Sequence, residues 1–578
     1  MTEVQSKLGR LLVRLRVYWT RKRVITDLGH PRISKPCRFQ ERQGFFVFHC
    51  HRLRYSVCIL FCNTSAVATF LRYLLLVFMC MGLAACSRLP APVHEPVEAV
   101  EPNASTVSEL ARALAPLQQA NAGQSGVALL PGGREALAAR LGLIDAAQRS
   151  IDVQYYIWND DVAGLLMFDA LKRAADRGVT VRLLLDDNNT KGMDALLWEV
   201  DQHENIQVRL FNPFVHRHFR FWSYLTDFKR LNRRMHNKSL TVDNAASILG
   251  GRNIGDAYFE LGQETLFVDL DVLAVGPVAK EVTDDFDKYW SSESSYPVWQ
   301  VMSAPAEKVS ITERANEVRR LEVGRAYHDS VSEQSLIDAI QSGSLVFHWA
   351  RVHLVSDDPK KALGLAQPGK LVIDALPQLL GTPHERLMVV SPYLVPTSNG
   401  TQFFTQLADR GVEVRILTNS LAATDVAVVH SGYAKWRKAL LKAGVTIFEM
   451  KPAYSVGQVG RPAFSGSSSA SSLHAKTFAV DSSHLFVGSF NFDPRSARLN
   501  TEMGLVIESP EMVSQVWDNV QNALAQSSYQ VTLDPAGNLI WLDHSNDPPI
   551  AYKSEPETNV FSRSAVWLMS KLPLDWLL

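Results

Sequence analysis

The chain has 578 residues, of which 46% are apolar and 9% aromatic, so it is long enough for about two to four domains and apolar enough to build large cores. This composition excludes an intrinsically disordered protein. The formal charge is zero overall, but residues 1–66 hold 13 Lys and Arg against 3 Asp and Glu, which leaves 46 against 56 in the rest of the chain.

The first 86 residues differ in character from the rest. They contain all six cysteines, so the remainder can form neither a disulfide nor a thiolate metal site. Residues 67–86 place one arginine before an apolar run that ends in LAAC, which resembles a bacterial lipoprotein signal with Cys86 as the lipidated residue. A transmembrane anchor that leaves Cys86 unmodified is the alternative. Because such a signal belongs at the start of a chain, we expect native initiation at Val67 and no native translation of the basic segment 1–66.

Residues 87–108 are rich in proline and acidic residues and show no apolar period, which is typical of a tether. With Cys86 lipidated, the protein is expected to be membrane-associated, anchored on the periplasmic side. The serine that follows Cys86 favours the outer membrane by resemblance to Gram-negative sorting, and the choice between inner and outer membrane stays open.

An internal repeat organises the rest of the chain. RSIDVQYYIW (149–158) can be aligned with RLMVVSPYLV (386–395), and ALKRAADRGVTVRLLLDDN (170–188) with TQLADRGVEVRILTNS (405–420). Each copy reads as a buried strand, an amphipathic helix that ends at a glycine, and a second strand. These patterns predict an α/β fold made by tandem duplication, in which two domains with central mixed sheets face each other across a pseudo-two-fold axis. The predicted first domain, connecting region, second domain and C-terminal extension are residues 109–300, 301–370, 371–530 and 531–578.

The same spacing of polar residues occurs once in each copy. Both read His-x-Lys, four residues, Asp, six residues, then Gly-x-x-Asn, and equivalent residues are 238 positions apart. One such motif arises by chance, but two in register within a duplicated fold indicate a shared site. The candidate catalytic residues are His236, Lys238, Asp243, His474, Lys476 and Asp481, and the candidate phosphate-binding residues are Asn253 and Asn491.

Histidine and lysine two residues apart on a strand point to the same face, so the two copies together predict a basic pocket with two imidazoles. Such a pocket suits a phosphodiester, since one neutral imidazole can attack phosphorus while the other, protonated, delivers a proton to the leaving oxygen. The lysines and the asparagine amides would hold the non-bridging oxygens. This chemistry requires no metal and no cofactor. Asp243 and Asp481 end a strand at a turn, so a fold-stabilising role and a chemical role are both open for them.

These motifs resemble those of the phospholipase D superfamily, over residues 125–515. Segments such as DFKRLNRRMHNKS, GGRNIGDAYF and GSFNFDPRSARLNTEMGLVIES are similar, within that superfamily, to the bacterial cardiolipin synthases of the C class. The resemblance implies a phosphatidyltransferase that makes cardiolipin from phosphatidylglycerol, with phosphatidylethanolamine as donor, through a phosphatidyl-histidine intermediate. It also implies that His236 is the nucleophile and His474 the general acid and base. A phosphodiester hydrolase with the same site is the alternative, followed by a non-catalytic lipid-binding lipoprotein.

In that superfamily an acid on a later strand orients each motif histidine. The second copy supplies Glu502. In the first copy, counting from the asparagine leads to Glu264, whereas aligning the strand ends leads to Asp269. We prefer Asp269, because it shares a strand face with Asp271 and the loop before it is lengthened.

Two segments outside the motifs are expected to contact lipid. Residues 211–234 interleave Phe, Trp and Tyr with Arg, Lys and His, as an interfacial or anionic-headgroup surface does, and a solvated loop is the alternative. Nucleic acid is disfavoured by the net charge of −10 after residue 66 (46 minus 56). The last fifteen residues, 564–578, are too short to span a bilayer but suit lying in one, or docking on the protein as a helix. The sequence identifies no protein partner.

Three further polar residues stand out. Asp186 and Asp187 follow a predicted strand, and we expect them to contact substrate or cap a loop rather than hold a metal. His430 lies in a predicted helix, where a structural role is favoured over contact with an acceptor headgroup.

Overall fold

The structure, a computed structural model, describes residues 89–93, 107–261, 268–321, 335–452 and 473–573, and the backbone of residues 41, 42, 45 and 46. The chain divides into two compact units, Met1–Ser87 and Arg88–Leu578. In the first unit, β1 (Glu41–Arg42) pairs antiparallel with β2 (Phe45–Phe46). Among the described helices, none is both long and apolar enough to cross a membrane. Cys86, the predicted signal, nearly all of the upstream segment and Glu264 lie outside the described residues.

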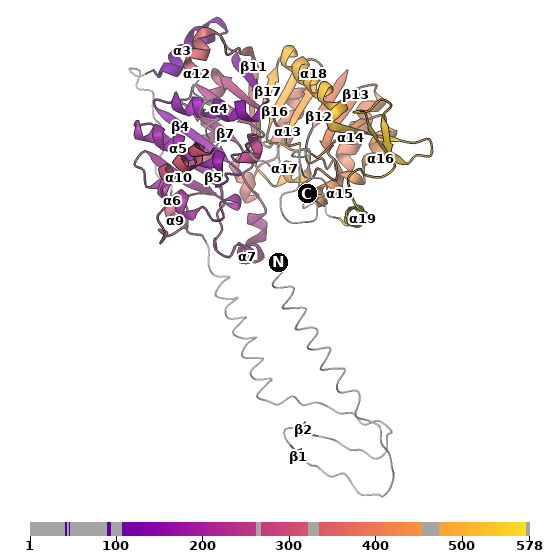
Figure 1. The fold of residues 1–578 in the computed structure, drawn as a ribbon, viewed down its shortest axis with the longest axis horizontal. Helices are drawn as coiled ribbons and strands as arrows, with labels where there is room; N and C mark the ends of the chain where they lie inside the picture. The colour runs from indigo at the N-terminus through magenta and orange to yellow at the C-terminus, as the bar shows by residue number, and fades with distance from the viewer. Residues whose placement is uncertain are drawn as a thin grey trace. The chain divides into compact units, whose positions relative to one another are not determined.

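The first half of the second unit is a mixed sheet flanked by helices, drawn from indigo to magenta in Figure 1. Its strands follow the hydrogen-bonded order β10-β6-β5-β4-β7-β8-β9-β3, in which β4, β5 and β6 run parallel and the other neighbours antiparallel. The elements are α3 (Glu109–Ala120), β3 (Ser125–Leu130), α4 (Gly133–Asp145), β4 (Ser150–Tyr155), α5 (Val162–Asp176), β5 (Thr180–Asp186), η1 (Asp187–Asn189), α6 (Asp194–Asp201), β6 (Ile206–Phe211), α7 (Arg220–Leu231), β7 (Ser239–Val242), β8 (Ala246–Gly250), η2 (Asp256–Tyr258), β9 (Asp271–Val275), α8 (Pro277–Trp290) and β10 (Ser295–Pro297).

The second half repeats this order as β14-β13-β12-β15-β16-β17, with β18, β19 and β20 added beyond β14. Its elements are α13 (Val372–Leu380), β12 (Arg386–Val390), α14 (Thr397–Asp409), β13 (Glu413–Asn419), α15 (Ala427–Ala434), α16 (Arg437–Lys442), β14 (Thr446–Met450), β15 (Thr477–Val480), β16 (His484–Gly488), α17 (Pro494–Arg498), β17 (Met503–Glu508), α18 (Pro510–Ser527), β18 (Ser528–Leu533), β19 (Leu539–Asp543), β20 (Ile550–Tyr552) and α19 (Val560–Met569). Between the halves lie α9 (Val298–Val301), α10 (Ile311–Arg320), α12 (Leu336–Ser342), β11 (His348–Ser356) and η3 (Pro359–Leu363).

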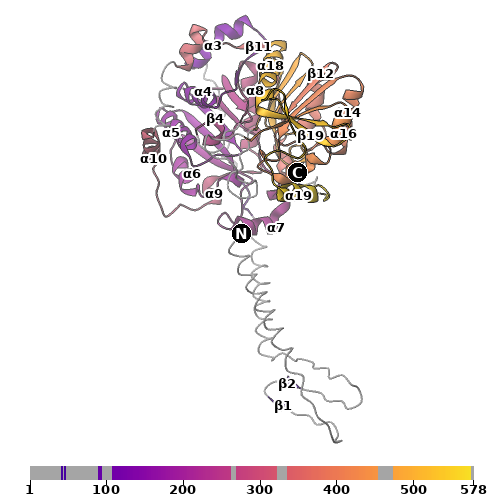
Figure 2. The same cartoon turned by 45° about the vertical axis from the view of Figure 1, so that its right-hand side comes forward.

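Strand β11, from the predicted connecting region, joins the two halves. Its first three residues pair with β3 and its last six with β17. The described strands of this unit therefore form one continuous hydrogen-bonded order of eighteen strands. Outward from the β3–β11 pair, the order β9-β8-β7-β4-β5-β6 on one side is repeated by β17-β16-β15-β12-β13-β14 on the other. Figures 1 and 2 show the two halves side by side, as the predicted pseudo-two-fold requires.

The sheet register corrects our alignment of the first repeated strand by one residue. The amide of Asp243 donates to Ser150 O, and that of its counterpart Asp481 donates to Arg386 O. Ser150, not Arg149, is therefore equivalent to Arg386. A shift of one residue moves every side chain to the other face of the strand, so only the structural alignment assigns faces correctly.

Apolar side chains between the two sheets form a core that belongs to both halves. It includes fully buried residues from β3, β8 and β9 on one side and from β16 and β17 on the other, namely Val127, Leu249, Val272, Leu485, Leu505 and Ile507. Each half also has an outer core between its sheet and its helices. The shared core confirms the predicted pair of α/β domains with sheets that face each other.

The loops that end the repeated helices follow the sequence pattern. Gly178 and Gly411 have φ angles of 90° and 87°, a left-handed conformation that glycine adopts without steric cost. Each helix therefore stops at the same point of the repeat, and the chain turns back into β5 or β13.

Candidate active site

The motif histidines lie in segments directly before β7 and β15. The strands begin one residue after each lysine, so the motifs precede the strands rather than lie within them. The His236 amide donates to Thr501 O (2.9 Å), and the His474 amide donates to Val268 O (2.8 Å). Each histidine is thus held by the backbone of the opposite half, one residue before that half's orienting acid.

The orienting acids are exchanged between the halves. His236 Nδ1 lies 2.8 Å from Glu502 Oε2, and His474 Nδ1 lies 2.6 Å from Asp269 Oδ2. Because a carboxylate only accepts, each Nδ1 carries the hydrogen, and Nε2 is left with the lone pair that attacks phosphorus or takes a proton. The structure thus places Asp269 at the histidine, as the alignment of strand ends predicts.

Both acids are ionised in this arrangement. Burial alone would raise the pKa of Asp269, but His474, Lys476 and Arg252 outweigh it and lower the pKa to about 2. Burial opposes ionisation of Glu502 in the same way, and His236 and the neighbouring lysine lower its pKa below the usual range. Glu502 also accepts a hydrogen bond of 2.5 Å from the Ser489 hydroxyl. Each histidine therefore faces a fixed negative charge.

The imidazoles themselves are neutral near pH 7. Burial lowers the pKa of His236 to about 4, since desolvation outweighs Glu502 and Lys238 adds repulsion. Burial, together with repulsion by Lys476, lowers the pKa of His474 to about 3. A neutral imidazole is the form that acts as nucleophile or base.

The two lysines are buried beside the histidines. Lys238 Nζ donates to His236 O (2.6 Å), and Lys476 Nζ donates to His474 O. Burial lowers their pKa values to about 7 and about 8, and the site carboxylates oppose these shifts. Repulsion between Lys238 and Lys476 adds to the lowering of the Lys238 pKa. Two buried ammonium groups beside the motif histidines are suited to bind an anion.

Asn253 and Asn491 lie in the loops that follow β8 and β16, and both are buried. Asn253 Oδ1 accepts from the Ile157 amide (3.2 Å). The backbone N–H of Asn491 donates to the Ser496 hydroxyl (3.3 Å). Their role as phosphate ligands stays a prediction.

Asp243 and Asp481 lie at the far end of the strands from the histidines. Asp243 accepts from the backbone amides of Gln148, Arg149 and Ser150, and Asp481 from those of His384, Glu385 and Arg386. Both have left-handed φ angles, 54° and 52°. These contacts tie the β7–β8 and β15–β16 turns to the starts of β4 and β12, which favours the fold-stabilising reading.

Two aromatic rings that our sequence reading did not single out contact the histidines. Tyr156 lies edge-on to His236, with ring centroids 5.0 Å apart, and Tyr258 lies edge-on to His474 at 5.2 Å. Both belong to motif segments, VQYYIW and GGRNIGDAYF, but tyrosine near a motif is too common to be diagnostic. Asp357, from the connecting region, was also missed, and it accepts from the Glu502 amide (2.8 Å).

The remaining polar candidates have structural partners. Asp186 pairs with Arg234 and accepts from the Met235 amide (2.8 Å), so it positions the segment that leads into His236. Asp187 pairs with Arg217 and accepts from the Phe214 amide (2.7 Å), which caps the loop as expected. His430 lies 3.1 Å from Glu555, so it anchors the C-terminal extension.

Comparison with known proteins agrees with this geometry. The family model described as "Cardiolipin synthase, PLD-like domain" matches twice, at residues 141–290 and 376–524. The chain is 45% identical over 478 residues to Cardiolipin synthase C of Escherichia coli (strain K12), covering 81% of this chain and 99% of that protein. It is 33% identical over 449 residues to an uncharacterized protein of Helicobacter pylori (strain ATCC 700392 / 26695), covering 77% of this chain and 88% of that protein.

A solved structure shares the fold. The phosphatidylserine synthase of Haemophilus influenzae Rd KW20 has a TM-score of 0.52 at 15% sequence identity, and the match covers 82% of this chain and 100% of that chain. The two family matches coincide with the two halves that share the site. The chain therefore belongs to the phospholipase D superfamily, in its cardiolipin synthase-like family of phosphatidyltransferases.

Proposed function

We propose that this protein makes cardiolipin by transferring a phosphatidyl group from a donor phospholipid, phosphatidylethanolamine, to phosphatidylglycerol. The observation on which the proposal depends is the pair of buried imidazoles, each hydrogen-bonded through Nδ1 to a carboxylate of the other half. The 45% identity to a protein named Cardiolipin synthase C supports transfer over hydrolysis.

In the first step, His236 Nε2 attacks the donor phosphorus and forms an N–P bond while the P–O bond to the headgroup alcohol breaks. His474, as imidazolium, gives its proton to the leaving oxygen. Its pKa is lowered to about 3 by burial and by Lys476, which repels a second positive charge. The bound phosphodiester anion offsets that repulsion and raises the pKa, so substrate binding supplies the protonated acid.

In the second step, the phosphatidylglycerol hydroxyl gives its proton to His474, now neutral, and its oxygen forms a P–O bond as the N–P bond breaks. Cardiolipin leaves and His236 is regenerated. Lys238 and Lys476 stabilise the negative charge on the non-bridging oxygens in both steps, because they are preorganised in a buried site of low dielectric constant. Water in place of the lipid hydroxyl would give phosphatidic acid, which is the hydrolase alternative.

The test uses purified protein with phosphatidylethanolamine and phosphatidylglycerol, and identifies the products by mass spectrometry. Cardiolipin with free ethanolamine is expected. Phosphatidic acid as the sole product would assign hydrolysis, and no turnover would assign lipid binding alone. His236→Ala and His474→Ala should each lower the rate by several orders of magnitude, whereas His544→Ala, at an exposed histidine remote from the motifs, should not.

Trapping identifies the nucleophile. A quenched single turnover should give a phosphatidyl adduct on a peptide that contains His236, and His474→Ala should change its lifetime but not its position. An adduct found on His474 instead would reverse the two roles.

We also propose that the protein works at a membrane surface, anchored through Cys86 on the periplasmic side. In both views α7 and α19 lie at the same end of the folded unit (Figures 1 and 2). Large apolar side chains on and beside these helices are exposed, namely Phe219, Phe221, Leu225 and Phe228 near α7 and Phe561, Trp567 and Leu568 on α19. Basic residues lie among those near α7, as suits anionic headgroups. Mass spectrometry of the native protein tests the anchor, since an unlipidated Cys86 inside an uncleaved chain would refute it.

A further inference from the structure

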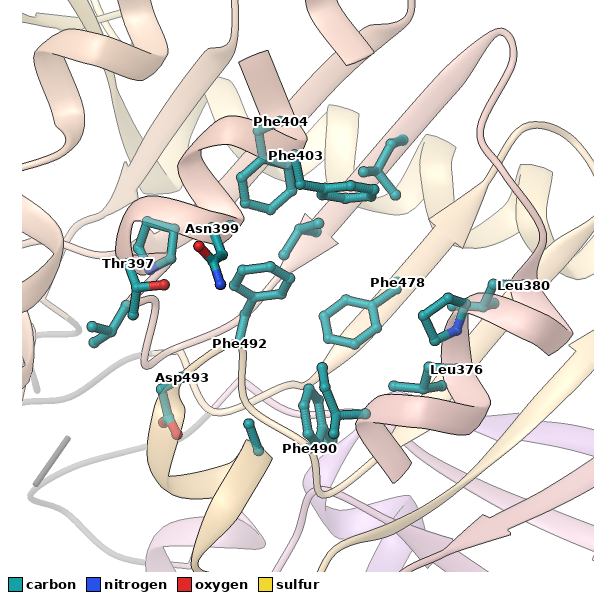
Figure 3. A pocket seen from close by; sticks show the side chains of 18 of the residues that line it. Leu376, Leu380, Thr397, Asn399, Phe403, Phe404, Phe478, Phe490, Phe492 and Asp493 are labelled. Atoms are coloured by element: carbon teal, nitrogen blue, oxygen red, sulfur yellow. The ribbon is translucent and has the colours of Figure 1, made fainter. Parts of the chain in front are cut away.

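A cavity of about 770 Å³ lies in the second half, between α13, α14 and the sheet (Figure 3). Its walls are mainly apolar. The rings of Phe478, Phe490 and Phe492 line it from the sheet side, Leu376 from α13 and Phe404 from α14. Its volume is typical of pockets that bind small molecules.

The cavity adjoins the catalytic site. Phe478, in the cavity wall, follows Lys476 by two residues, and Lys476 O accepts a hydrogen bond from the Gly488 amide at the start of β15. Asn491 falls between two of the lining phenylalanines in the sequence. Asp493, which lines the cavity, interacts electrostatically with the ammonium group of Lys476. The cavity wall is therefore adjacent in sequence to both Lys476 and Asn491, and its residue Asp493 lies within electrostatic range of Lys476.

Polarity changes along the cavity. In Figure 3, Thr397, Asn399 and Asp493 lie toward one end, and Leu376 and Leu380 toward the other. Asp493, the lining residue that interacts electrostatically with Lys476, lies at the polar end. A molecule with a charged head and an apolar tail matches this order.

Several residues that line the cavity are smaller than the residues at the equivalent positions of the first half. The helices α5 and α14 can be aligned at the glycines that end them, Gly178 and Gly411. In this alignment, three residues of α14 take the places of three buried residues of α5: Ser398 of Leu165, Asn399 of Leu166 and Gly400 of Met167. A Cβ atom on Gly400 would lie 2.9 Å from the Phe492 ring, so glycine is required for this close approach. Ala497, in the cavity wall, corresponds by the motif spacing to Phe259, which is fully buried in the first half. The second half has exchanged bulky core residues for small or polar ones at the cavity.

We propose that this cavity binds one acyl chain of the phosphatidyl donor while its phosphate lies between the two histidines. The inference rests on the proposed phosphatidyl transfer, since it places the phosphate at the motif lysines. The enzyme then draws one chain of the donor out of the bilayer, and chain length contributes to kcat/KM. The first half carries buried Phe259 and Leu166 at the corresponding positions.

Short-chain phosphatidylethanolamines, used as monomers below the concentration at which they form micelles and with a fixed concentration of the phosphatidylglycerol acceptor, test the proposal by donor consumption. Each buried methylene should raise kcat/KM about fourfold, so a dioctanoyl lipid should exceed a dibutanoyl lipid by about two hundredfold when one chain enters the cavity. In Ala497→Phe, which restores the first-half residue, this ratio should fall at least tenfold. Gln402→Phe adds the same ring to the exposed side of α14 and should keep the ratio. An unchanged ratio in Ala497→Phe would overturn the proposal.

Binding is tested separately from turnover. Trp436 lines the cavity, so a phosphatidylethanolamine with brominated acyl chains should quench its fluorescence in the inactive His474→Ala protein. The quenching should be lost when Trp436→Phe is added and reduced when Ala497→Phe is added. Quenching without any turnover of the wild-type protein would support the acyl site while refuting phosphatidyl transfer. Turnover without quenching that depends on Trp436 would refute the acyl site alone.

Discussion

The two buried lysines explain how the site attracts a phosphodiester and why its activity should depend on pH. Lys238 has a pKa of about 7 and Lys476 a pKa of about 8, because burial disfavours their charged forms. The neutral imidazoles are lost only at low pH, since His236 has a pKa of about 4. The free enzyme therefore has its working charges, neutral imidazole and protonated lysines, between pH 4 and pH 7.

We predict a bell-shaped pH profile of kcat/KM, which reports the free enzyme. The profile should rise through about pH 4 as His236 loses its proton, and fall above about pH 7 to 8 as the lysines lose theirs. The fall in kcat should occur at higher pH, because the bound phosphate favours the charged lysines. The measurement is steady-state turnover of a short-chain phosphatidylethanolamine, with phosphatidylglycerol as acceptor, from pH 3 to pH 10.

Lys238→Arg supplies the control for this assignment. Arginine stays charged over the whole range, so the alkaline limb of kcat/KM should move up toward the pKa of Lys476 even where the rate itself is lower. If the alkaline decrease of kcat/KM in Lys238→Arg occurred at the same pH as in the wild-type protein, a group other than Lys238 would be its cause.

Asp243 is predicted to stabilise the fold rather than to take part in the reaction. Asp243→Ala removes the acceptor for three backbone amides at a residue with φ of 54°, and should lower the free energy of unfolding by about 1–3 kcal/mol, with kcat changed only a few-fold. Asp243→Asn should lose less, since asparagine keeps one acceptor and tolerates the left-handed conformation. Urea unfolding and kcat are measured together. A thousandfold loss of kcat at unchanged stability would instead assign a chemical role.

At the scale of elements, α7 combines exposed aromatic rings with ion pairs that hold its N-terminal end on the protein. Phe221 and Leu225 are 72% and 63% exposed. In the same segment Arg217 and Arg220 pair with Asp187 at the end of β5. The helix is therefore held on the protein by its arginines, and its apolar side chains are left to contact another surface. This favours the interfacial reading of residues 211–234 over a loop that covers the core.

The double variant Phe221→Asp and Leu225→Asp should weaken binding to vesicles of phosphatidylethanolamine and phosphatidylglycerol at least tenfold, since each large apolar side chain contributes about 1.5–3 kcal/mol on burial. The measurement is sedimentation of residues 88–578 with vesicles, with and without phosphatidylglycerol. Val346→Asp is the control, because Val346 is 66% exposed and precedes β11 by two residues. The label of β11 lies at the opposite end of the unit from α7 (Figures 1 and 2). Equal binding by the double variant and the control would contradict a membrane role for α7.

For the whole folded unit, the exchange of acids makes the two halves interdependent. Glu502 orients a histidine of the first half and Asp269 one of the second, and β11 is hydrogen-bonded to both sheets. The core between the sheets also draws on both. Neither half contains a complete catalytic pair.

We therefore predict that Arg88–Leu578 unfolds as one cooperative unit. Ile507→Ala, in the core between the sheets, should cost about 2–5 kcal/mol. The loss should appear in hydrogen exchange of β4 as well as β12, although only β12 is in the same half as Ile507. Faster exchange confined to the second half would show that the two domains unfold independently.

The sequence by itself determined the duplicated α/β fold, the family and the residue types of the site, because these follow from local spacing. His-x-Lys, the aspartate and the asparagine recur 238 residues apart, and strand and helix patterns recur with them. It also pointed to Asp269, through the alignment of strand ends. Periodicity and spacing are properties of short segments, so they can be read without the fold.

Only the tertiary structure decided how these residues combine. The pairing of His236 with Glu502, 266 positions away, depends on how the two sheets pack, and no local pattern encodes it. The one-residue register of β4 is set by hydrogen bonds to β5 and β7, whereas a sequence alignment places it only to within a residue. The acyl cavity depends on volume left unfilled between α13, α14 and the sheet, because a void results from the packing of segments that are distant in the chain.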